Sequence, residues 1–289
     1  MLHMEPDYQR GIRPDYSLSV EDVYKDLMVC HIQNSENIEL FQYISVVETF
    51  PTSWVLELGN TDLPRFPFPA IFGASGNSRH EIVYSEANED LCVRGVHVGI
   101  ISRVGESVPN AASIAKILDI CRRWEPPDLH DTKYVDGRSL FDAFLKTILC
   151  GAVDENVKGG ELPNLESLRQ AYLLCLRERL VDESTNQLCW LLEAFTPGRA
   201  FFSTTDGRIG LCLPSAQAGD YIIAALGHKN ALALRPIAES SGRFRLKGEC
   251  FVHGVMQNDA FLGQLSELGC TQYPWRLEYQ SDDLLAVYQ

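Results

Sequence analysis

The chain has 289 residues, of which 45% are hydrophobic, and a formal net charge of −14 at pH 7. That hydrophobic content is ordinary for a globular protein, and the acidity argues against nucleic-acid or anionic-membrane partners, because phosphate surfaces are bound by clustered Lys and Arg. The nine Cys include no Cys-x-x-Cys pair and lie mostly within apolar runs, a pattern typical of reduced, buried thiols rather than disulfides.

The first part of the chain, residues 1–109, predicts one helix, an irregular segment and short strands. Ser19 with Asp22 three positions later is typical of a helix N-terminus. Residues 51–80 are rich in Pro and Gly, and their phrase LPRFPFPAIFG excludes a regular helix or a central strand. Residues 91–104 alternate apolar and polar side chains, which predicts one bent strand or two short ones. We interpret the irregular segment as an ordered loop that carries aromatic residues.

The middle of the chain, residues 110–197, predicts a helical section. Apolar residues recur at helical spacing in four segments, separated by Pro and Gly. The expected N-terminal residues of these helices are Asn110, Ser139, Asn164 and Gln187.

The last part, residues 198–289, predicts an antiparallel β-barrel or sandwich. Its apolar runs are short and are cut by turn signals about every ten residues. Asp206-Gly207 lies between two such runs and is a strong hairpin signal, and Ser241-Gly242 separates another two. The order of elements predicts an α+β fold in which the helices pack with the C-terminal β-module as one compact unit.

Phrases throughout the chain resemble one protein family. Between residues 198 and 254, the phrases GRAFF, DGRIGL, LRP and RLKGECFVHG closely resemble the closing β-module of fungal heterokaryon-incompatibility proteins. PDYSLSVEDVY at 14–24, FPTSWVLELGN at 50–60 and DLCVRGVHVGIISRVGE at 90–106 resemble earlier phrases of the same family, although LEL replaces its Pro-Asp-Trp. The resemblance implies the C-terminal half of such a protein, and we expect it to stand alone without the HET effector domain.

The sequence contains no signal for export, membrane insertion or cofactor binding. Its N-terminus lacks the apolar core of a signal peptide, and no run reaches the roughly 18 apolar residues of a transmembrane helix. Zinc-protease, P-loop and nucleophile-elbow motifs are absent from the sequence. Asp128, His130 and Asp131 are close enough to ligate a metal, but their Pro-rich surroundings favour a solvated loop. We therefore expect a cytoplasmic protein, a monomer or weak dimer, with no metal and no cofactor.

Polar residues of the β-module are the candidate chemical groups. Arg235, Glu249 and His253 match the family's LRP and GECxVHG phrases, whereas His228 falls in a tight turn where the family carries a small or thiol residue. A structural alternative for two of them is an ion pair between Arg235 and Glu249 on adjacent strands. Glu249 and His253 would share one face of a regular strand, about 13 Å apart.

Two functions are compatible with these features. The first is a cofactor-independent enzyme of fungal specialised metabolism, such as a cyclase or Diels–Alder catalyst, which positions an apolar substrate and offers one hydrogen-bond donor. The second is a non-catalytic recognition or regulatory module, for which we expect an exposed apolar patch. For the enzyme, we expect the substrate between residues 54–84 and one face of the β-module. The catalytic candidates are His228, Arg235 and His253. The substrate-binding candidates are Trp54, Phe66, Phe68, Phe72, Tyr84 and Glu249.

Overall fold

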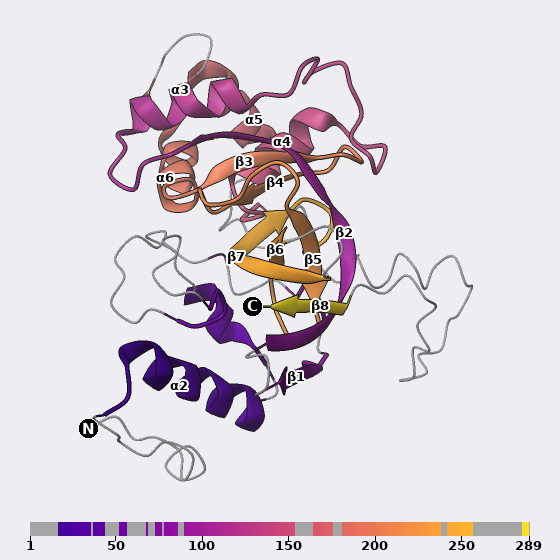
Figure 1. Ribbon diagram of the computed structural model, residues 1–289. Helices are drawn as coiled ribbons and strands as arrows, with labels where there is room; N and C mark the ends of the chain where they lie inside the picture. Colours follow the sequence, from indigo (N-terminus) through magenta and orange to yellow (C-terminus); the bar gives the residue numbers. More distant parts are fainter. Residues whose placement is uncertain are drawn as a thin grey trace.

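The protein combines helices with one mainly antiparallel sheet, and the predicted α+β class is confirmed (Figure 1). The computed structural model describes residues 17–35, 37–43, 52–56, 68, 73–76, 78–85, 90–153, 164–175, 181–237 and 242–256, and the backbone of 285–288. Within these residues, no helix has the length and apolar character needed to cross a bilayer.

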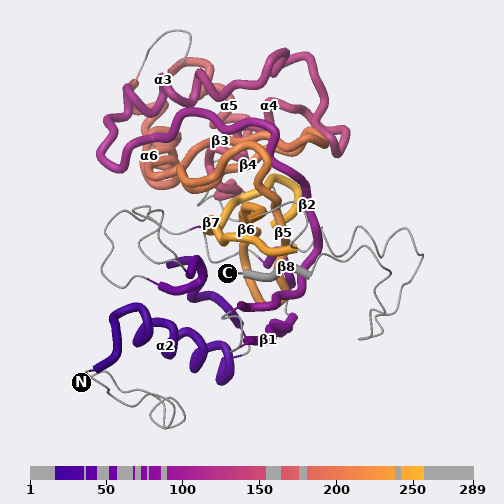
Figure 2. Tube along the Cα trace, in the orientation of Figure 1, coloured from indigo at the N-terminus to yellow at the C-terminus, as the bar shows by residue number. Residues whose placement is uncertain are grey.

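The helices lie at two ends of the molecule. Helix α2 and a short 3-10 helix, η1, occupy the N-terminal end, and α3 to α6 gather at the other (Figures 1 and 2). Their bounds are α2 Val20–Asn34, η1 Glu39–Tyr43, α3 Ile114–Trp124, α4 Leu140–Ile148, α5 Leu165–Leu173 and α6 Asn186–Phe195.

The strands lie between these two groups of helices. The long strand β2 runs from the N-terminal end to the helical end, as Figure 2 shows. The strand bounds are β1 Ile82–Ser85, β2 Asp90–Ser107, β3 Ala200–Thr204, β4 Ile209–Cys212, β5 Tyr221–Ala225, β6 Ala231–Pro236, β7 Arg243–Val252 and β8 Leu285–Tyr288.

Strand pairing closes six of the strands into a ring. The order is β2-β3-β4-β7-β6-β5, and β5 pairs again with β2. Strand β2, 18 residues long, pairs with β1 and β8 near its start, with β5 in its middle and with β3 near its end. The expected bent strand is therefore one continuous element, and register shifts mark its irregularities. Pairing is antiparallel except between β7 and β8.

Side chains fill the inside of the ring. Buried residues of all six ring strands form one cluster, which includes Phe202, Cys212, Ala224, Ala233 and Cys250. A second cluster packs α3 to α6 against the outer side of β3 and β4. A third packs α2, η1 and Trp54 against β5, β6 and β7. The inside of the ring is therefore a packed core.

Local turn and cap signals account for most of the predicted element boundaries. The Asp206-Gly207 hairpin is confirmed: β3 and β4 pair up to Ser203 opposite Ile209, and Gly207 has the positive φ of +87° that glycine tolerates. Ser19, Ser139 and Asn164 cap α2, α4 and α5 as predicted.

The start of α3 differs from the prediction. Ser113, not Asn110, is its N-cap, because the Ser113 hydroxyl accepts from the amide of Lys116. Ala112 N donates to Pro109 O, so the chain makes a turn before it enters the helix.

Candidate functional site

A hollow of about 330 Å³ lies between the α3–α4 connection and the β3–β4 hairpin. We call it the aromatic groove. Its apolar wall includes Trp124 at the end of α3, Tyr134 in the connection and Phe201 on β3. Pro126 and Pro127 end α3 and continue that wall. The same prolines that stop the helix therefore also shape the hollow.

Trp124 is fixed in the groove by three contacts. Its ring stacks on Phe201 with centroids 6.1 Å apart, and its indole N–H donates to the carbonyl of Glu106 at 2.8 Å. Gly105 lets the indole lie against β2, since a Cβ there would fall 2.6 Å from Trp124 Cδ1. The aromatic surface is thus preorganised.

Tyr134 holds the other side of the groove in place. Its hydroxyl donates to the carbonyl of His253 at 3.1 Å and accepts from the amide of Ile209 at 3.3 Å. Burial raises the pKa of Tyr134 to about 12. The hydroxyl therefore serves to position the α3–α4 connection on the hairpin, and it is not an acid or base near neutral pH.

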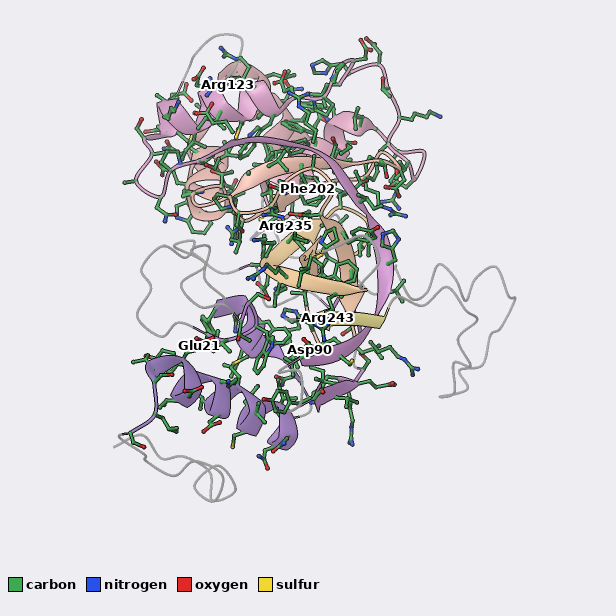
Figure 3. The ribbon with its side chains drawn as sticks, in the orientation of Figure 1. Glu21, Asp90, Arg123, Phe202, Arg235 and Arg243 are labelled. Carbon is green, nitrogen blue, oxygen red and sulfur yellow. The ribbon has the colours of Figure 1, made fainter. Side chains whose placement is uncertain are left out.

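The charged side chains that line the groove are all basic. They are Arg103, Arg123 and Lys133. Arg123 lies on α3 at the helical end (Figure 3), where it pairs with Glu106 at 2.7 Å and with Asp119 at 2.5 Å. Arg103 and Lys133 are exposed and have no ion pair with another described residue.

A second polar group lies buried where β5 turns into β6. We call it the turn cluster, and it consists of His228, Asn230 and Glu249. Asn230 Nδ2 donates to Glu249 Oε1 at 2.9 Å, and the Asn230 amide donates to His228 Nδ1 at 3.1 Å. Because Nδ1 accepts, the neutral imidazole carries its proton on Nε2, which lies 3.3 Å from Glu249 Oε1.

Burial drives both ionisable groups of the turn cluster towards their neutral forms. It raises the pKa of Glu249 from 4.5 to about 7, an effect that the Asn230 hydrogen bond opposes. It lowers the pKa of His228 to about 3. Glu249 therefore gains or loses a proton near neutral pH, whereas His228 stays uncharged, and the carboxyl is chemically suited to acid–base work.

N-terminal segments cover the turn cluster. Phe41 of η1 stacks near the His228 ring at 6.2 Å, and Ser75 Oγ donates to the His228 carbonyl at 2.8 Å. A Cβ on Gly227 would fall 2.5 Å from the backbone nitrogen of His80, so only glycine fits there. The cluster thus joins the sheet to the segments that precede β2.

The predicted ion pair between Arg235 and Glu249 is wrong. Arg235 Nε instead donates to Asp220 at 2.9 Å, and its Nη2 donates to the carbonyl of Ser215 at 2.7 Å. In the β6–β7 ladder Arg235 lies opposite Arg245, whereas Glu249 lies towards the other end of the pairing. Figure 3 shows Arg235 among the strands, away from the helical end that carries Arg123.

The three catalytic candidates lie in different environments. His228 belongs to the turn cluster, and Arg235 is held by Asp220. His253 follows the end of β7, so its predicted shared strand face with Glu249 does not apply, and its ring packs against Tyr134 at 5.1 Å. A common role in one cavity stays a prediction for these residues.

The predicted aromatic group is divided. Trp54 packs edge-on against Tyr84, with centroids 5.8 Å apart, in the core beside α2. Phe68 lies in the core of the helical end, where the Arg199 guanidinium is 4.1 Å from its ring centroid. Phe66 and Phe72 lie outside the described residues.

The structure adds residues that the sequence pattern did not single out. Asn230 is the link of the turn cluster, and Trp124 and Tyr134 build the aromatic groove. The basic residues that line the groove come from separate segments, so the sequence alone offers no signal that they lie together. Among the described residues no group of three or more His, Cys, Asp or Glu could hold a metal ion, and His130 packs on Phe141 at 4.9 Å.

Comparison with known proteins finds no matching family model, no matching curated protein and no matching solved structure.

Proposed function

We propose that the protein is a recognition module that binds an apolar small molecule in the aromatic groove. The observation that carries the proposal is the hollow of about 330 Å³ walled by Trp124, Phe201 and Tyr134. Ligand pockets are typically a few hundred Å³ in volume and are lined by aromatic and hydrophobic side chains with a few polar groups. The groove has this size and this composition.

The location of the groove supports the same proposal. We treat the ring of strands as a small closed barrel, whose inside is filled by its own side chains. A ligand then binds where a covering segment leaves space on the outside, and the α3–α4 connection is such a segment. Recognition without turnover fits the groove because Tyr134, its central polar group, already has both a donor and an acceptor partner.

A cofactor-independent enzyme is the second candidate, and Glu249 is the observation that favours it. A carboxyl whose pKa is about 7 can protonate a substrate carbonyl at neutral pH. For such an enzyme, a segment that precedes β2 would move to open the turn cluster to substrate. The protein would then catalyse a cyclase-type reaction by holding the substrate in a reactive geometry. Descent from the C-terminal half of a heterokaryon-incompatibility protein is part of either proposal.

Ligand-observed NMR with 2-naphthamide, a neutral aromatic probe, tests the proposed function. We expect binding to the wild type and loss of binding in Thr132→Phe, since the exposed Thr132 lines the groove and a phenyl ring would fill it. Gln187→Phe places the same ring on the exposed face of α6 and should bind normally. Equal binding by both variants would place the ligand elsewhere.

The second candidate has its own test. If Glu249 acts on a substrate, its carboxyl must become reachable, and a water-soluble carbodiimide with an amine should label it at pH 6. Mass spectrometry of the modified peptide gives the readout. A Glu249 that stays unlabelled while exposed carboxylates react would assign the turn cluster to structure alone.

A further inference from the structure

We propose that the ligand of the aromatic groove is an anion, a small aromatic or otherwise apolar carboxylic acid whose carboxylate is bound by Arg103 and Lys133. This inference rests on the proposed function and specifies its ligand class. It follows from the charge of the groove, from which of its basic residues form ion pairs, and from where these residues lie on the fold.

The charge of the groove is opposite to that of the protein. The chain has 39 acidic and 25 basic residues, yet the charged residues that line the groove are all basic. No Asp or Glu is among the described residues that line it. A positive site on a protein of negative net charge raises the local concentration of anions at that site.

The basic residues differ in whether their charge is already compensated. Arg123 is bound by the carboxylates of both Glu106 and Asp119, so it adds little net charge. Within the part of the chain that the structure describes, Arg103 and Lys133 have no such partner. Two uncompensated positive charges therefore remain beside an apolar surface.

Two carboxylates in turns next to the groove are bonded within those turns. Asp206 pairs with Arg208 at 2.9 Å and also receives the Thr204 hydroxyl. Asp136 accepts from the amide of Arg138 at 2.9 Å. These local bonds hold the two carboxylates in their own turns, and neither carboxylate forms an ion pair with Arg103 or Lys133.

The backbone holds both cations in defined places. Arg103 lies on β2 opposite Ser203 of β3, and Lys133 forms a β-bridge with Ser139 that closes the α3–α4 connection. An Arg guanidinium can donate two parallel hydrogen bonds to a carboxylate, and a Lys ammonium adds a compact positive charge. The aromatic wall then binds the apolar part of the same molecule.

A matched pair of probes tests the charge requirement. 2-Naphthoate and 2-naphthamide have nearly the same shape and differ in charge at neutral pH. We expect calorimetry to give 2-naphthoate at least a tenfold lower Kd at low salt, and we expect the preference to shrink at 0.5 M salt because partly exposed pairs are screened.

Charge-removing variants assign the effect to the two residues. Arg103→Gln and Lys133→Gln should each reduce the preference for 2-naphthoate over 2-naphthamide by about three- to tenfold. Arg122→Gln removes an exposed charge from α3 outside the groove lining and should preserve the preference. Circular dichroism checks that the variants fold alike.

The possible failures are distinct. If both probes bind equally, the anion inference is wrong and the proposed function stands. If neither probe binds, the proposed function fails as well. A preference that survives both Gln substitutions overturns the assignment to Arg103 and Lys133. Tighter binding of a peptide ending in Trp than of 2-naphthoate overturns the small-molecule assignment in favour of a chain terminus.

Discussion

Asn230 donates a hydrogen bond from its side-chain amide to Glu249 across the β6–β7 pairing, at 2.9 Å, in a site where Glu249 is only 6% exposed. This bond joins the turn before β6 to the middle of β7. It also stabilises negative charge on Glu249, so it opposes the effect of burial on the pKa of that carboxyl. The protonation state of Glu249 therefore depends on a residue of the turn.

The first prediction concerns Asn230 itself. Replacing Asn230 with Ala removes the donor and should lower the free energy of unfolding by about 1–3 kcal/mol, since a buried acceptor loses its partner. Urea denaturation at pH 7 measures this change. Asn186→Ala on the exposed surface of α6 is the control and should change stability by under about 0.5 kcal/mol. Similar losses for the two variants would contradict the role of Asn230.

The second prediction is a pH dependence that belongs to Glu249. Its pKa in the folded protein is about 7, above the 4.5 expected in the unfolded chain. Folding is therefore favoured by the protonated form, and that contribution is complete below about pH 4.5 and is lost as the pH rises through 7. Glu249→Gln stays neutral, so it should be more stable than the wild type at pH 8, by up to a few kcal/mol.

Stability curves of both proteins between pH 4 and pH 8.5 check this result. The advantage of Glu249→Gln should shrink towards pH 4.5. His228 acts in the opposite direction: its pKa is depressed to about 3, so its contribution is present above pH 6.5 and is lost as the pH falls. Because both proteins retain His228, the difference curve isolates Glu249. A flat difference curve would mean that folding does not raise the pKa of Glu249.

Much of the fold could be predicted because its signals are local. Ser19, Ser139 and Asn164 each accept a hydrogen bond from the amide three residues ahead. Asp206-Gly207 fits the backbone of its hairpin whatever surrounds it. Such signals depend on a few consecutive residues. They fix where elements begin and end, although Asn110 shows that neighbouring cap residues compete.

The site could be predicted much less well because it depends on register and on distant contacts. The partner of Arg235 follows from the alignment of β5 with β6, in which Tyr221 lies opposite Leu234, and from the position of Asp220 just before β5. The groove joins β2, the end of α3, the α3–α4 connection and β3. No local pattern relates Arg103 to Lys133, and their shared role appears only once the ring of strands has closed.

The third prediction compares a buried ion pair with an exposed one. Asp220 is 1% exposed, so Arg235→Gln leaves a buried carboxylate without its cation and should cost about 3 kcal/mol in the free energy of unfolding. Arg94→Gln breaks the exposed pair with Glu81 and should cost less than about 1 kcal/mol. Thermal and urea unfolding measure both. A small effect of Arg235→Gln would mean that the Gln217 amide, which donates to Asp220 Oδ2 at 2.8 Å, suffices to hold the carboxylate.

The fourth prediction uses Gly105 to test whether the orientation of Trp124 forms the groove. In Gly105→Ala the new Cβ would lie 2.6 Å from Trp124 Cδ1 and 2.8 Å from its Nε1, closer than such atoms approach. The indole must move, and its bond to the Glu106 carbonyl should break. We expect a loss of about 1–3 kcal/mol in stability and a shift of the Trp124 indole N–H resonance in NMR spectra.

Binding distinguishes the displaced ring from general destabilisation. Gly105→Ala should abolish binding of 2-naphthamide, because the aromatic wall is then misplaced. Gly219→Ala is the matched control: its positive φ of +93° makes alanine unfavourable, yet a Cβ there meets nothing within 4 Å. It should lose a comparable amount of stability and keep both the Trp124 resonance and the affinity for 2-naphthamide. If the control loses binding equally, stability rather than the position of Trp124 determines affinity. If Gly105→Ala binds normally, the indole is not part of the binding surface.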